Sequence, residues 1–185
     1  MNRIYFLIVF SFVLLTSGCA NVVKDYKASA LNVNTIEENY NSSDIKVKIS
    51  GFTSDGSETT SLMCRLEGPI KPPGGISFEA YITEAFKSEL NFAKIYSEDS
   101  LTSFNLYFKD ISFNSTIGMG KWVIASNLSS ANNSDMKVES IYEFSTNYVA
   151  GIACAQVSEA FPKAVQKFIA TIISHPEFER IISTQ

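Results

Sequence analysis

The segment Ser103–Asn114, SFNLYFKDISFN, alternates apolar and polar residues with the two-residue period of a half-buried β-strand. The alternation changes phase at Lys109–Asp110, which predicts a β-bulge there. Two further β-rich segments follow at Lys121–Ser129 and Met136–Val149, each preceded by residues typical of turns. The pattern predicts a meander of three antiparallel strands.

Upstream of the meander, the sequence predicts two strands and a helix. Residues 44–52, DIKVKISGF, alternate in the same way, and residues 61–66 predict a second, short strand. Residues 68–75, GPIKPPGG, contain too much proline and glycine for a helix or a central strand. In residues 77–94 apolar side chains recur at spacings of three and four, and Ser77 is placed to cap the first turn. We expect this helix to pack on the sheet.

Downstream, residues 153–174 predict a closing helix with one apolar face. Pro162 lies inside this segment and must either kink the helix or begin a new one, so we expect a bend near Phe161. Residues 177–182 can form a last helical turn. The predicted fold class is α+β, in the order β(β)-α-β-β-β-α, with a mainly antiparallel sheet and two helices packed on one face.

The composition of the 185-residue chain favours one globular domain. Apolar residues make up 45% of the chain and charged residues 18%, a balance that disordered and collagen-like chains do not have. The 15 basic residues against 19 acidic ones give a net charge of −4, which offers no electrostatic footprint for a phosphate backbone. We therefore expect no nucleic-acid partner.

The N-terminus has the layout of an export signal. Arg3 provides a positive charge, and residues 4–15 form an uncharged, mostly apolar run. This run is too short to span a hydrocarbon core of about 30 Å. It ends in Leu14–Cys19, LLTSGC, which resembles the bacterial lipobox. The resemblance implies that Cys19 is diacylated and becomes the mature N-terminus; an ordinary secretory signal with a chance cysteine is the alternative.

The lipobox resemblance also implies where the protein resides. Several acyl chains hold a protein firmly on a membrane, and the absence of Asp directly after Cys19 implies the outer membrane, facing the periplasm, in a Gram-negative host. The expected domains are a lipoprotein signal peptide at 1–18, the lipidated cysteine with a tether at 19–43, and a periplasmic αβ domain at 44–185. A short strand or helix around residues 28–36 remains an open alternative within the tether.

A second resemblance lies in the first predicted helix. Residues 82–96, ITEAFKSELNFAKIY, are similar to the corresponding helix and its exit in small bacterial envelope lipoproteins of the YajG-like, ABC-transport auxiliary and penicillin-binding-protein-activator types. Lys94 stands where those proteins usually have glycine. The layout of residues 44–174 resembles theirs too. The resemblance implies a compact αβ body on a lipid anchor.

Cysteine and histidine provide few candidates for chemistry. With Cys19 assigned to lipid, Cys64 and Cys154 remain, and an oxidising compartment favours a disulfide between them; two buried free thiols are the alternative. The sequence contains no CxxC pair, which would be typical of a metal site. The single histidine, His175, lies at the end of a helix. A protonated ring there interacts favourably with the helix dipole, which is a sufficient structural reason for the residue. We predict no enzyme activity, no metal and no cofactor.

The sequence therefore favours a non-enzymatic accessory or assembly factor that binds another envelope component. The exposed edge of the meander is the preferred contact surface, because an open edge can accept a partner's strand; its candidate residues are Trp122, Ile124, Tyr142 and Phe144. The alternative is a small-ligand or lipid-binding module with a groove between the last helix and the aromatic sheet. That groove would be lined by Phe104, Phe108, Trp122, Tyr142 and Phe144.

Overall fold

The computed structural model describes residues 21–40, 45–130 and 134–182. The predicted signal peptide and the predicted lipidation site, Cys19, lie outside the described residues. Within the described part of the chain, no helix is long and apolar enough to cross a membrane.

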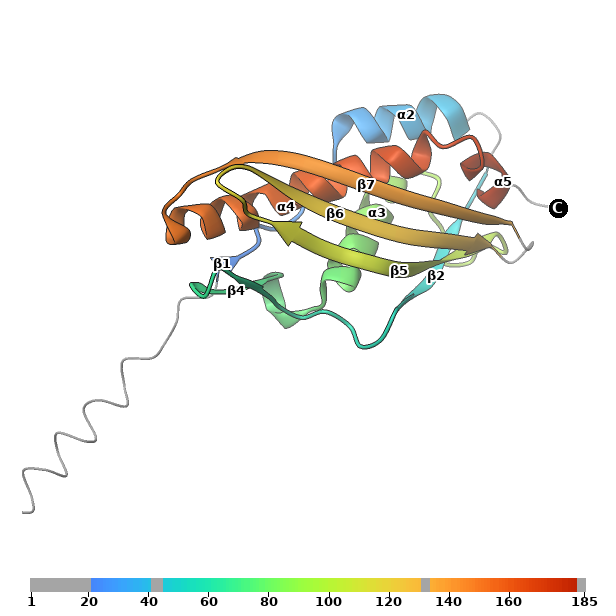
Figure 1. The fold of residues 1–185 in the computed structure, drawn as a ribbon. Coiled ribbons are helices and arrows are strands. Elements are labelled where there is room, and N and C mark those ends of the chain that lie inside the picture. Colours follow the sequence, from blue (N-terminus) through green and yellow to red (C-terminus); the bar gives the residue numbers. More distant parts are fainter. Residues whose placement is uncertain (1–20, 41–44, 131–133, 183–185) are drawn as a thin grey trace, which may run out of the picture.

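A four-stranded sheet forms the centre of the fold, in the order β2-β5-β6-β7 (Figure 1). Strands β5 to β7 form the predicted antiparallel meander, while β2 runs parallel to β5. The pairing of β5 with β6 shifts between Phe108 and Asp110, so the predicted bulge is confirmed. The strands are β2 (Lys48–Ser54), β5 (Ser103–Asn114), β6 (Gly118–Ser130) and β7 (Asp135–Thr146).

Helices pack on one face of this sheet, which confirms the predicted α+β class. The helices are α3 (Phe78–Phe92), α4 (Ala150–Ile173) and the short α5 (Phe178–Ile182). Ser77 caps α3 as predicted, since its Oγ accepts the amide of Ala80 at 3.1 Å. Pro162 neither ends α4 nor begins a new helix, because α4 continues through it.

Trp122 joins the sheet to the two long helices. Its ring centroid lies 5.8 Å from that of Phe78 on α3 and 4.6 Å from that of Phe161 on α4. Its indole nitrogen donates to the carbonyl of Val157 at 2.9 Å. A fully buried tryptophan needs such a partner, so this single side chain fixes the packing of three elements.

A smaller sheet, in the order β1-β4-β3, corrects the loop prediction for residues 68–75. Its strands are β1 (Asn21–Val22), β3 (Leu62–Cys64) and β4 (Gly68–Lys71), and Pro73–Gly75 forms one 3-10 turn after them. Pro69 lies within the central strand β4 and stands opposite Met63 of β3.

Residues 21–40 of the predicted tether belong to the folded body, and the helix considered as an alternative around residues 28–36 is present as α2. After β1, helix α2 (Ala30–Tyr40) packs against α3 and α4 and buries Asn32, Ile36 and Tyr40. The Tyr40 hydroxyl donates to the carbonyl of Ile173 at 2.8 Å. Only three side chains at a spacing of four are buried in α2, so the sequence shows little amphipathic period.

The predicted disulfide between Cys64 and Cys154 is present. It joins the end of β3 to the second turn of α4, across a sequence separation of 90 residues. Both cysteines are fully buried. The bond therefore fixes the smaller sheet on the main body.

Removal of this disulfide should destabilise the protein strongly. For a closed loop of this length, chain entropy gives about 4 to 5 kcal/mol of stabilisation. We expect chemical denaturation to show a free energy of unfolding lower by about that amount for the Cys64→Ala, Cys154→Ala double variant. Alkylation of the non-reduced wild-type protein, followed by intact mass spectrometry, should leave both cysteines unmodified; two alkylated thiols would contradict the bond.

Gly120 should not tolerate a side chain. A Cβ built there would stand 2.6 Å from Thr146 Cγ2 and 2.7 Å from Phe144 Cζ. We expect Gly120→Ala to lower the free energy of unfolding by about 1 to 3 kcal/mol through overpacking. Gly51→Ala is the control, because the nearest atom to its Cβ is Asn105 Oδ1 at 3.9 Å. Equal unfolding midpoints for the two variants would contradict this prediction.

Candidate functional site

The predicted partner edge is only half correct. Trp122 and Ile124 lie on β6, an inner strand, and are 0% and 1% exposed, so they cannot meet a partner. Their side chains alternate toward the helices, which is the core face of the sheet. Tyr142 and Phe144 do lie on the edge strand β7, but they are half-buried and pack against the core.

The edge of β7 is also partly protected. On α4, the Lys167 side chain donates to the carbonyl of Ile141 at 2.7 Å. Charged side chains, Lys137, Glu139 and Glu143, alternate along the strand and are exposed. Charges along an edge strand disfavour the addition of another strand. The edge of β7 is therefore a poor site for the addition of a partner's strand.

The aromatic groove considered as an alternative site is filled by its own side chains. Phe104, Phe108 and Trp122 are at most 2% exposed. Phe108 packs against Phe168 of α4, with ring centroids 6.3 Å apart. These rings form the core between the sheet and the helices.

The opposite face of the sheet carries a groove of about 480 Å³, named here the open-face groove. Outward side chains from all four strands line it. Tyr107 lies near its middle, and the ammonium group of Lys109 stands 4.1 Å from the centre of the Tyr107 ring. The lining residues are Thr53, Asn105, Tyr107, Asn127, Ser129, Asp135, Met136 and Lys137.

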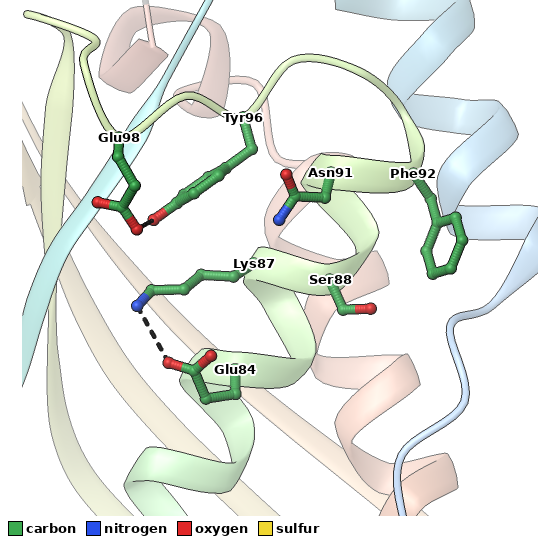
Figure 2. Close-up of a pocket in the computed structure, with 7 residues that line it drawn as sticks. All are labelled: Glu84, Lys87, Ser88, Asn91, Phe92, Tyr96 and Glu98. Carbon is green, nitrogen blue, oxygen red and sulfur yellow. Dashed lines mark hydrogen bonds and ion pairs between the residues drawn. The ribbon is translucent and has the colours of Figure 1, made fainter.

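A second depression, of about 540 Å³, lies beside α3 (Figure 2). Its charged groups are paired: Lys87 Nζ lies 3.0 Å from Glu84 Oε1, and the Tyr96 hydroxyl donates to Glu98 Oε1 at 2.6 Å. Phe92 points away from these side chains in Figure 2, and its side chain is exposed. The depression thus contains one ion pair and one carboxylate that accepts a hydrogen bond from a neutral phenol.

The ionisation of this second depression follows from the same contacts. The hydrogen bond from Tyr96 holds the pKa of Glu98 below its ordinary value, and Lys48, 3.7 Å away, acts in the same direction. Burial raises the pKa of the Tyr96 hydroxyl, and the neighbouring carboxylate raises it further. At neutral pH the pair is a carboxylate bound by a neutral phenol, so neither group is poised to exchange a proton.

Glu89 forms a third, buried polar cluster inside the body. The residue is 0% exposed. Its Oε1 accepts a hydrogen bond from the Ser29 backbone amide at 2.9 Å and a short one from the Tyr26 hydroxyl. Its Oε2 accepts a hydrogen bond from Asn32 Nδ2 at 2.9 Å. Burial raises the pKa of Glu89, while these three donors oppose that shift. The carboxylate therefore binds residues 26–32 to helix α3.

Sequence reasoning missed this cluster because it joins side chains that lie about 60 residues apart in the sequence. Glu89 follows Ile82 by seven residues and Ala85 by four, so it lies on the apolar face of α3. A carboxylate at an apolar position of a helix is the signal that could have identified it. Its donors come from a segment that shows no periodicity.

The other candidates for chemistry have structural explanations. His175 Nδ1 accepts the amide of Glu177 at 3.1 Å, where α4 ends and α5 begins. Among the described residues, no three side chains of His, Cys, Asp or Glu come together as a metal site.

Neither a protein-family model nor a curated protein sequence matches the chain. Among solved structures, the fold is similar to the crystal structure of protein XCC0632 from Xanthomonas campestris, whose description gives the family model DUF330. The TM-score is 0.48 at 6% sequence identity, and the similarity covers 70% of this chain and 81% of that one.

The buried Glu89 predicts a specific dependence of stability on pH. The pKa of Glu89 is raised in the folded state, so folding favours the protonated carboxyl. As the pH rises above 4.5, the ordinary pKa of the group, the unfolded protein ionises more readily than the folded one and the free energy of unfolding falls. The Glu89→Gln variant cannot ionise at this position. We expect its free energy of unfolding to decline less between pH 5 and pH 7 than that of the wild type.

Chemical denaturation of both proteins at several pH values measures this difference. Glu84→Gln is the matched control on the same helix, because Glu84 is exposed and pairs only with Lys87. Its pH profile should follow that of the wild type. Parallel profiles for Glu89→Gln and wild type would contradict the prediction.

Proposed function

We propose that this protein is a lipid-anchored component of the bacterial envelope that acts without catalysis, as an accessory or assembly factor that binds another envelope component. The anchor at Cys19 and the outer-membrane location rest on the lipobox resemblance of residues 14–19. The binding role rests on the shape of the folded body.

The observation that carries the binding role is the open face of the four-stranded sheet. Helices α3, α4 and α5 pack on the core face, while the outward side chains of β5 to β7 alternate with the buried ones and are exposed or half-buried. A sheet with one open face is a ready surface for a partner, and here it also carries the open-face groove.

The chemistry of the open-face groove favours an extended polypeptide as the bound component. Asn105 and Asn127 offer amides that both donate and accept hydrogen bonds, as an extended backbone requires. Tyr107 provides a flat aromatic surface, and Asp135 and Lys137 provide one charge of each sign. A peptide segment with polar side chains satisfies all of these groups.

A photo-reactive amino acid at Asn127 tests the proposed function. In cells that produce the full chain, irradiation should give one defined protein adduct from Asn127 and the same adduct from Asn105. Asn34 is the matched control: it is exposed on α2, which contacts α3 and α4. Probes there should give no such adduct.

A charge change provides a second readout of the same surface. Asn127→Arg should reduce the adduct formed from Asn105 severalfold, because the guanidinium occupies the groove. Recovery of only abundant lipoproteins, or equal adducts from Asn127 and Asn34, would contradict the proposed function.

A further inference from the structure

Exposed apolar side chains gather at one end of the body, named here the apolar end. Leu66 is 97% exposed at the turn between β3 and β4, and Ile117 is 69% exposed at the turn between β5 and β6. Tyr148 is 76% exposed just before α4. Other exposed apolar residues of these same segments are Met63, Met119, Val149 and Ile152.

Arg65 holds the three segments of the apolar end together. Its Nε donates to Ser115 Oγ at 3.1 Å, and its Nη2 donates to the Ser115 carbonyl. Its Nη1 donates to the carbonyls of Asn147 at 3.0 Å and Tyr148 at 3.3 Å. One guanidinium therefore joins the β3–β4 turn to the β5–β6 turn and to the start of α4. The disulfide of Cys64 attaches the same turn to α4.

The turn that carries Leu66 has an unfavourable backbone conformation. Arg65 and Leu66 have φ angles of 46° and 64°, and the Glu67 amide donates to the Cys64 carbonyl at 2.9 Å. Two positive φ angles in succession usually require Asn and Gly, and each costs a bulky residue free energy. The adjacent disulfide and the Arg65 hydrogen bonds maintain this geometry, and it presents a leucine to solvent.

The one acidic residue of this turn, Glu67, is exposed and lies beside the start of α4. Glu67 Oε1 lies 3.3 Å from the position that a Cβ on Gly151 would occupy, at the start of α4. The N-terminus of a helix favours a carboxylate. The Glu67 carboxylate therefore lies near a helix end that favours its charge.

The first described residues of the chain, in β1, lie near the apolar end. Strand β1 runs parallel to β4, with Asn21 opposite Ile70 and Val22 opposite Lys71. Asn21 therefore lies toward the end of β4 that begins at Gly68, next to the turn with Leu66. Cys19 precedes Asn21 by two residues, which reach about 7 Å at most. Figure 1 shows β1, the β5–β6 turn and the start of α4 at one end of the molecule.

We propose that the apolar end lies on the surface of a lipid bilayer, with Leu66, Ile117 and Tyr148 inserted between headgroups. This inference rests on the lipid anchor of the proposed function, because an acylated Cys19 leaves about two residues of chain between the bilayer and β1. Aromatic and aliphatic side chains are the groups that such an interface accepts. The body then has one fixed orientation on the membrane.

Site-specific photo-labelling of the full chain in a Gram-negative host tests this proposal. A photo-reactive side chain at Leu66 should form an adduct with phospholipid, detected by its mass, and so should one at Ile117, which lies on a different turn. Leu101 is the matched control: it is 95% exposed and precedes the opposite end of β5. A probe there should give no lipid adduct above background.

Lipid adducts absent from both Leu66 and Ile117, or equally abundant at Leu101, would overturn the proposal. Adducts of Leu66 with a protein, including a second copy of this chain, would assign the apolar end to a protein interface instead. The mass of the N-terminal peptide reports acylation of Cys19 separately, and the Asn127 adduct reports the partner. Failure of the bilayer contact is therefore distinguishable from failure of the proposed function.

Discussion

The buried carboxylate of Glu89 determines how the N-terminal segment relates to the rest of the protein. It is 0% exposed, and it accepts hydrogen bonds from Tyr26, Ser29 and Asn32. The Asn32 amide also donates to the carbonyl of Gln166 on α4 at 2.9 Å. A buried carboxylate that lost its hydrogen-bond donors would lower the stability of the fold. These hydrogen bonds therefore hold residues 26–32 against α3 and α4. The segment is thereby part of the body.

This constraint changes what a lipid anchor at Cys19 would mean. A coil of about 24 residues would let the body move some 25 to 30 Å from a bilayer. Instead, β1 pairs with β4 from Asn21 onward, and the disulfide fixes the adjacent β3 to α4. An anchor so close to a rigid body limits both its height and its rotation. The orientation of the body then becomes a property of the fold.

The sequence predicted the elements whose periodicity is strong. The strand 103–114 was predicted with its bulge, and the helix 77–94 with its cap, because burial of one face requires the apolar spacing that the sequence shows. Helix α2 and strand β4 could not be predicted in this way. α2 is held in part by the polar cluster centred on Glu89, through Asn32, and β4, which contains Pro69, is held by pairing with β1 and β3. Both depend on tertiary partners that local patterns do not contain.

The two proposed surfaces lie at different distances from the anchor. Strand β5 ends at Asn114, next to the β5–β6 turn of the apolar end, whereas Asn105 in the open-face groove lies nine residues earlier. A strand advances about 3.3 Å per residue, so roughly 30 Å of sheet separates the groove from that end. With the apolar end on a bilayer, as proposed, the strands would extend away from it and hold the groove at about that distance from the membrane. In that arrangement the sheet holds the groove away from the bilayer, which the sequence analysis had expected a flexible tether to do.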